Sequence, residues 1–260
     1  SDMAAGAAKR ALEAAGLEVG GVEPARFETV GARLAAAIAA RTAGLACSTV
    51  LFETSALVPD LDVAIDAARA VGAEVLLDTY HHHGVVPLSL RADVYATGGG
   101  YKYLQWGEGN CWLRVPAGST LRPIYTGWVS GFAHPAAPRR ARLEYGARPA
   151  GPFAGPPYRA RRVIDFFARE GLTIERLRAR SLAQTARLRE GLAGYAVRTP
   201  EARGGFVTVE LDDAPGTVAR LRERGVFVDA RGRLLRLGPA PYTTDDELER
   251  ALAHFRDVAR

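Results

Sequence analysis

Apolar and polar residues form two repeating patterns along the first 120 residues of the chain. Apolar residues recur at helical spacing in three segments, which predicts helices over 4–15, 28–40 and 60–73. Short apolar runs bounded by turn residues predict buried strands over 43–50, 74–80, 92–98 and 110–115. Because strands separated by helices are typical of a parallel sheet, we expect an α/β fold with a mainly parallel sheet flanked by helices.

The second half of the chain begins with a different pattern. Prolines and glycines crowd residues 116–157, which predicts loops and connections. Helical spacing returns from Tyr158, and short strands and a last helix from Thr244 follow. This alternation predicts an α/β unit of its own, so we expect a large domain over 1–139 and a small C-terminal domain over 140–260.

Composition and charge narrow the class of protein. The sequence shows neither an apolar run long enough to span a bilayer nor a signal segment, so no membrane association is predicted. Cys47 and Cys111 are too few for a disulfide framework, which favours a cytoplasmic setting. The net charge is +5, but arginines alternate with acidic residues instead of forming a basic stripe, so no nucleic-acid partner is predicted.

Lys102 is the first candidate for chemistry. The chain contains only two lysines, Lys9 and Lys102, among many arginines, and Lys102 stands between two tyrosines after three glycines. Lysine, unlike arginine, can lose its proton and act as an amine nucleophile. The glycines would allow the backbone to approach a planar cofactor closely. The alternative is a partly exposed lysine whose aliphatic stem packs on the core.

Asp78 lies at the carboxyl end of the predicted strand 74–80, where open α/β sheets bind their ligands, and His81 comes three residues later. An imine-forming lysine and an aspartate that keeps a ring nitrogen protonated are what pyridoxal phosphate chemistry requires. Asp78 could instead be a turn or cap residue. Three consecutive histidines could suggest a metal, but neighbours in an extended segment point to opposite faces and no spaced His or Cys lies nearby, so no metal site is predicted.

Four motifs of the chain resemble the kynureninase family, within the fold-type I pyridoxal phosphate enzymes close to class V aminotransferases. In family order they are D-x-x-H-x-x-G from Asp78, Y-K-Y-L from Tyr101, G-W at 127–128 and R-x-x-P-x-P-Y from Arg236. The resemblance extends from about Ala11 to the C-terminus. It implies a fold-type I architecture with a small C-terminal domain. It also implies that the large domain lacks its N-terminal part, where the family holds the cofactor phosphate at a helix N-terminus.

The resemblance implies a role for several residues. Lys102 would form the Schiff base with pyridoxal 5'-phosphate, and Asp78 would contact the pyridine nitrogen. His81 would lie beside the cofactor ring, and Tyr101 would help to hold the phosphate and transfer protons. Trp128 would reach into the site of a neighbouring subunit, which implies a homodimer.

Arg236 would bind the α-carboxylate of the substrate, since a guanidinium binds a carboxylate through two parallel hydrogen bonds. Its alternative role is a structural ion pair. The family reaction is hydrolytic cleavage of the Cβ–Cγ bond of kynurenine. However, Gly131 and Gly155 replace polar residues of the family pattern, so the substrate stays open.

Three functional hypotheses therefore remain. The first is a kynureninase-like lyase or hydrolase acting on an amino acid. The second is a homologue that is cofactor-deficient alone and works in a complex with a chain that supplies the missing N-terminal half. The third is a pyridoxal phosphate enzyme of secondary metabolism with altered chemistry such as β-elimination.

Overall fold

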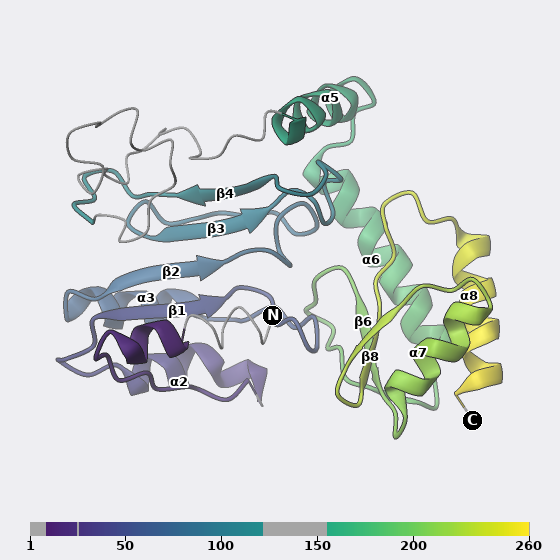
Figure 1. Cartoon of the computed structure of the whole chain (residues 1–260), viewed down its shortest axis with the longest axis horizontal. Helices are drawn as coiled ribbons and strands as arrows, with labels where there is room; N and C mark the ends of the chain where they lie inside the picture. The colour runs from purple at the N-terminus through teal and green to yellow at the C-terminus, as the bar shows by residue number, and fades with distance from the viewer. Residues whose placement is uncertain (1–8, 25, 122–154, 260) are drawn as a thin grey trace.

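Two sheets organise the residues that the structure, a computed structural model, describes, namely 9–24, 26–121 and 155–259 (Figure 1). The strands of the first sheet are, in spatial order, β1 (Gly44–Ser48), β2 (Glu74–Asp78), β3 (Tyr95–Gly99) and β4 (Cys111–Arg114). The first three are parallel, and β4 runs antiparallel to β3. The predicted mainly parallel sheet is confirmed.

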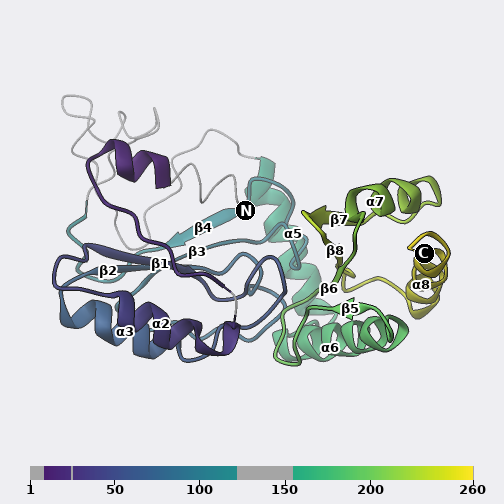
Figure 2. The ribbon, with the colours of Figure 1, turned by 90° about the horizontal axis from the view of Figure 1, so that it is seen from below.

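Helices pack on one side of this sheet. A 3-10 turn, η1 (Phe27–Thr29), precedes α2 (Val30–Ala37), and α3 (Leu61–Ala70) follows β1. Figure 2 places α2 and α3 on the same side of the strands. Val75 and Leu77 of β2 are buried on this side, whereas Leu76 points away and is 38% exposed. The alternation follows the two-residue period of a strand.

The first long helix is shorter than its sequence pattern predicts. The apolar spacing extends to residue 40, but α2 ends at Ala37 and Ile38 is extended. Thr42 Oγ1 accepts a hydrogen bond from the backbone N–H of Ala39 at 2.9 Å. This side-chain bond closes a turn that competes with the helix, as threonine side chains often do.

The second sheet is antiparallel and belongs to the C-terminal half. Its spatial order is β5 (Ala196–Val197), β6 (Val207–Glu210), β8 (Leu234–Leu237) and β7 (Asp229–Arg231). The helices of this half are α5 (Gly155–Arg169), α6 (Ile174–Gly191), α7 (Ala214–Glu223) and α8 (Asp245–Val258). Its core gathers buried side chains from α6, α8 and the strands, including Leu188, Val209, Leu235, Leu252 and Phe255. The predicted domain boundary at 139/140 lies outside the described residues.

The last helix begins where the sequence predicts, directly after Thr244. Thr244 Oγ1 accepts from the N–H of Glu247 at 3.2 Å, and Glu247 Oε2 accepts from the N–H of Thr244 at 2.7 Å. This reciprocal capping box satisfies two backbone donors that have no partner inside the helix.

We expect Thr244→Ala to lower the free energy of unfolding by about 1 kcal/mol, because the cap is lost while the helix remains. Thr244→Ser, which keeps the hydroxyl, is the matched control. Urea denaturation followed by circular dichroism measures the difference. Equal midpoints for the alanine and serine variants would show that the cap contributes nothing.

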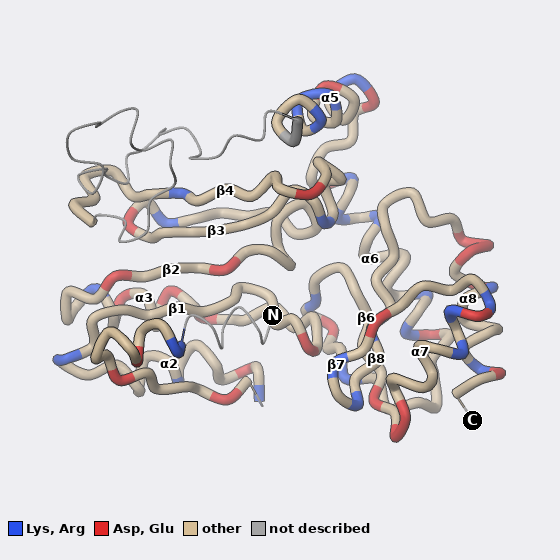
Figure 3. The backbone as a smooth tube through the Cα atoms, viewed as in Figure 1, with Lys and Arg blue, Asp and Glu red and all other residues tan. Residues whose placement is uncertain are grey.

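Basic and acidic residues are interspersed along the backbone of both halves of the described chain (Figure 3). Several of them pair across neighbouring elements; for example, Arg187 of α6 contacts both Asp245 and Glu249 of α8. Such exposed pairs stabilise a fold only weakly. Among the helices of the described ranges, none combines the length and the apolar character that crossing a membrane requires.

The segment that follows β1 joins the two halves. The N–H of Gly204 donates to the carbonyl of Ser55 at 2.7 Å, and Thr208 Oγ1 donates to the carbonyl of Glu53 at 2.7 Å. Arg236 of β8 donates to the carbonyl of Phe52, also at 2.7 Å. These bonds bring β6 and β8 to the carboxyl ends of the parallel strands, where a ligand site is expected.

Candidate active site

Three aromatic rings explain the glycine run at the end of β3. A Cβ added to Gly98 would lie 2.6 Å from an indole carbon of Trp112, and one added to Gly99 would lie 2.5 Å from Cε1 of Tyr101. At Gly100 the clash is with Cε3 of Trp106, at 2.0 Å. Side chains of the protein therefore occupy the space in which a Cβ would stand, so packing by itself explains the glycine run, and close approach of a cofactor to this backbone stays a prediction. Because glycine has no Cβ, the backbone can pass close to these rings on its way to Lys102.

The two tyrosines that flank Lys102 fix the loop on opposite sides. The Tyr101 ring lies 6.0 Å from that of Tyr80, whereas the Tyr103 ring packs on Gly205 of the C-terminal half, with Cε1 2.5 Å from where a Cβ would stand. The Lys102 Nζ lies 5.5 Å from the centroid of the Tyr101 ring. Neighbouring side chains thus anchor the backbone on both sides of Lys102.

The Lys102 amine is half-buried, and Nζ has no hydrogen bond or ion pair within the described part of the chain. Burial is the main cause that lowers the pKa of the Lys102 amine, and the positive charge of Arg236 lowers this pKa further. Asp229 and Asp78 oppose this change because their carboxylates favour the ammonium form. The result is an amine that loses its proton more readily than an exposed lysine, as a nucleophile requires.

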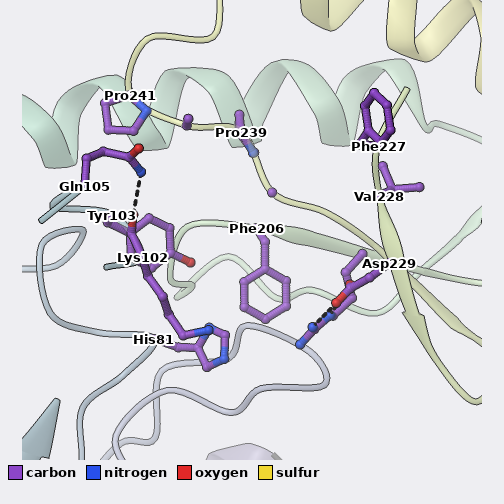
Figure 4. A pocket seen from close by; sticks show the side chains of 13 residues that line it. His81, Lys102, Tyr103, Gln105, Phe206, Phe227, Val228, Asp229, Pro239 and Pro241 are labelled. Atoms are coloured by element: carbon purple, nitrogen blue, oxygen red, sulfur yellow. Dashed lines mark hydrogen bonds and ion pairs between the residues drawn. The ribbon is translucent and has the colours of Figure 1, made fainter. Parts of the chain in front are cut away.

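Lys102, His81 and Arg236 line one cavity of about 350 Å³ between the two halves. Figure 4 shows the Lys102 side chain reaching toward His81, with Phe206 beside them and Pro239 and Pro241 on the opposite wall. The structure therefore brings together three of the residues singled out from motifs far apart in the sequence. Asp78 and Tyr101 do not line this cavity, although the charge of Asp78 acts on Lys102.

His81 contributes an unsatisfied ring nitrogen to the site. Its ring meets Phe206 edge-on at 5.4 Å, and Nδ1 is buried without a hydrogen-bond partner. Burial, and then the positive charges of Lys102 and Arg236, lower the pKa of His81 to about 3. A neutral imidazole with a free nitrogen is a group that a bound ligand can satisfy, since buried polar atoms are otherwise costly to leave unpaired.

We expect the His81 imidazole to remain neutral to far below its ordinary pKa of 6.5. The unfolded chain binds this proton near pH 6.5, so His81 should reduce stability progressively as the pH falls from 6.5 toward 3. NMR titration of the imidazole signals, with His81→Asn to assign them, measures the midpoint. A midpoint near 6.5 for His81 would contradict the burial and charge argument.

The other two histidines of the run have separate structural partners. His82 contacts Thr49 Oγ1 through Nδ1 and the Pro87 carbonyl through Nε2, each at 3.1 Å. His83 accepts a hydrogen bond from Trp112 Nε1 at 3.1 Å. Over the described ranges, no group of three or more His, Cys, Asp or Glu side chains is arranged to hold a metal ion.

Asp78 is held rigidly at the carboxyl end of β2. Ser48 Oγ donates to Asp78 Oδ2 at 3.0 Å, and the N–H of Tyr80 donates to Oδ1 at 2.9 Å. The second bond is the turn interaction that the sequence left open as an alternative. It leaves lone pairs on both oxygens, so the turn role and a role toward a ligand are compatible.

Arg236 is already paired inside the protein. Its Nε donates to Asp229 Oδ1 at 2.7 Å, and one terminal nitrogen donates to Asp229 Oδ2, while the other donates to the carbonyl of Phe52. The ion-pair alternative is therefore present. However, a guanidinium has five N–H donors, and these three bonds leave one on each terminal nitrogen. Within the described residues, these two donors have no hydrogen-bond partner and could bind a ligand.

Sequence reasoning did not identify Asp229, Gln105 or Phe206, which also line the cavity. The hairpin of β7 and β8 pairs Asp229 with Arg236 directly across the strands. The signal available in the sequence was the turn at Gly232 between two strand-like runs, which fixes that register. Trp128 and Gly131 lie outside the described residues, and Gly155 is the first residue of α5.

Comparisons with known proteins agree with this architecture. Residues 175–255 match the family model described as the kynureninase C-terminal domain. A solved structure of a NifS-like protein is 16% identical, with a TM-score of 0.67, over 88% of this chain and 64% of the other. Alanine–glyoxylate aminotransferase from Nostoc sp. is 20% identical, with a TM-score of 0.65, over 84% of this chain and 62% of the other.

Serine palmitoyltransferase of Sphingomonas wittichii is 20% identical, with a TM-score of 0.57, over 89% of this chain and 58% of the other. A second serine palmitoyltransferase structure, with a TM-score of 0.59, is described as holding pyridoxal phosphate as an internal aldimine. No curated protein matches the chain. The chain spans less than two thirds of the length of each of these structures. The chain shares the fold of these pyridoxal phosphate enzyme structures, fold type I, and its residues 175–255 match the model of a kynureninase C-terminal domain.

Proposed function

We propose that the chain is part of a pyridoxal phosphate enzyme of kynureninase type that acts on an amino acid. The observation that carries this proposal is Lys102, an amine of lowered pKa without an ionic partner in the described structure, which lines a cavity together with His81 and Arg236. Lys102 Nζ would hold the cofactor covalently. When bound, pyridoxal phosphate supplies an electron-withdrawing ring that stabilises negative charge at the substrate Cα.

The described residues fit the ring of this cofactor better than its phosphate. Asp78 offers a fixed carboxylate for the pyridine nitrogen. The buried Nδ1 of His81 has no hydrogen-bond partner in the described structure, and a bound ligand could supply one. None of the described residues that line the cavity begins a helix, the usual place for a phosphate.

We therefore propose that a second polypeptide completes the site. The second polypeptide would be either another copy of the same chain, with Trp128 reaching across a homodimer, or a companion that supplies the N-terminal half. Mixing experiments separate the two. Cofactor uptake that rises with concentration of the purified chain indicates self-association, whereas uptake only after a companion is added indicates a split enzyme.

Within the site, Lys102 Nζ is also the group suited to take a proton from the substrate Cα, because its lowered pKa leaves more of it neutral. The kynureninase-type domain favours Cβ–Cγ cleavage of kynurenine or a related substrate as the reaction. Release of fluorescent anthranilate from kynurenine tests this choice. Cofactor uptake without anthranilate release, but with release of a β-substituent from other amino acids, would instead assign a β-elimination.

We propose that Arg236 binds the substrate α-carboxylate through the two N–H donors that Asp229 and Phe52 leave open. Arg236→Lys keeps the charge but loses the fork, so we expect substrate affinity to fall by about 10–100-fold. Cofactor uptake should change little. The measurement is amino-acid titration of the cofactor-loaded protein by absorbance.

Arg231→Lys is the matched control for this experiment, because Arg231 also contacts Asp229, at 3.4 Å, but does not line the cavity. Affinity should be unchanged in that variant. If Arg236→Lys binds the amino acid as tightly as the parent protein, Arg236 serves the Asp229 ion pair alone.

A further inference from the structure

Gln105 lies in the loop 100–106 that carries Lys102, and it is the described residue of that loop in which three features occur together. Its φ is +58°, in the left-handed region, which long side chains rarely adopt. Its Nε2 donates a hydrogen bond to the carbonyl of Lys102 at 2.5 Å. Its side chain also lines the cavity, and Figure 4 shows it between Lys102 and Pro241. A backbone conformation that costs roughly 1 kcal/mol persists only where other contacts enforce it.

The rest of the loop is closed around this bond. The N–H of Trp106 donates to the carbonyl of Gly100 at 2.9 Å, so the two ends of the loop are joined. Tyr101 and Tyr103 fix the backbone on either side of Lys102, and Leu104 packs on Gly84, with Cγ 2.6 Å from where a Cβ would stand. These contacts fix the two flanks of the loop, whereas the Lys102 carbonyl itself accepts its hydrogen bond, among the described residues, from Gln105.

We infer that Gln105 is a positioning residue for Lys102, whose amide bond to the Lys102 carbonyl holds that residue so that its amine stays in the cavity. This role deepens the proposed function and, as a role in an enzyme, rests on it. The hold of Gln105 on Lys102 does not itself require the cofactor. Without the bond the loop loses one restraint, and the amine should become more exposed and less reactive at neutral pH.

The test uses the second lysine of the chain as an internal reference. Lys9 is exposed and lies 3.7 Å from Glu13, so it reports an ordinary surface amine. Trace acetylation over a pH series, followed by mass spectrometry of the two lysine peptides, gives the relative reactivity of Lys102. The charged groups that act on Lys102, chiefly Arg236, Asp229, Asp78 and Arg231, are unchanged in the variants.

Gln105→Gly removes the bond but is favourable for a left-handed residue, so the fold should be as stable as the parent or more stable. Gln105→Met keeps the length of the side chain without the amide. In both variants we expect the acetylation midpoint of Lys102 to rise. We also expect borohydride-trapped cofactor at position 102 to fall about fivefold, the effect of one hydrogen bond.

If Lys102 is acetylated in both variants as it is in the parent protein, and the adduct yield is also the same, the inference is wrong. A change in Gln105→Met without one in Gln105→Gly would also overturn it, since only packing would then be involved. Failure of the parent protein to trap any cofactor, alone or with a companion chain, would instead reject the proposed function. The acetylation result would still decide the role of Gln105.

Discussion

Lys102→Ala should abolish stable uptake of pyridoxal phosphate, measured as visible absorbance that survives gel filtration. The variant lacks the amine that would hold the cofactor covalently in the proposed enzyme, and the remaining non-covalent contacts should not retain it. The expected loss is at least about 100-fold in retained cofactor, because a covalent link is replaced by weak contacts. The cavity lining is otherwise unchanged.

Two further variants make the Lys102 result specific. Lys102→Arg keeps a positive charge but cannot supply a neutral amine, so it should also lose the cofactor. Lys9→Ala should retain it fully, since Lys9 lies on the surface. Retention of bound cofactor in Lys102→Arg would show that the cavity binds pyridoxal phosphate without using this amine.

Asp78→Asn should lower turnover of the assembled enzyme by about 100- to 1,000-fold, with little effect on covalent cofactor binding. The carboxylate favours the protonated pyridine nitrogen, and a pKa difference of two units corresponds to about 100-fold in population. Asparagine has nearly the same shape and can still accept from the N–H of Tyr80. The measurement is the single-turnover rate at saturating amino acid.

Asp66→Asn, a change of the same kind in an exposed ion pair with Arg91, should leave turnover unaffected. An unchanged single-turnover rate in Asp78→Asn would show that Asp78 serves only the turn that its bond to the N–H of Tyr80 forms. A protein that no longer folds would show lost circular dichroism, so folding is measured alongside.

The parts of this site that the sequence predicts are those set by local pattern. A buried strand followed by Asp78 and His81, and a lysine after glycines, place these residues at the carboxyl edge of a parallel sheet, because that position follows from strand order alone. Arg236 was linked to them only by family motif. Its place in the cavity depends on hydrogen bonds to Phe52, which lies 184 residues away in the sequence.

The parts that the sequence did not predict depend on packing between distant residues. The glycines at 98–100 accommodate the rings of Trp112, Tyr101 and Trp106, and a sequence pattern does not show which side chains fill that space. The left-handed conformation of Gln105 is equally hidden, since glutamine does not favour it. The end of α2 at Ala37 follows from one threonine bond that apolar spacing does not report.

Borohydride reduction of the protein with pyridoxal phosphate, followed by peptide mapping, tests the central claim most directly. It is carried out on the chain alone and with any companion that supports cofactor uptake. The account predicts a stable adduct on Lys102, with Lys9 essentially unmodified at low cofactor concentration. An adduct on Lys9 alone, equal labelling of both lysines, or no adduct at Lys102 under either condition would contradict it.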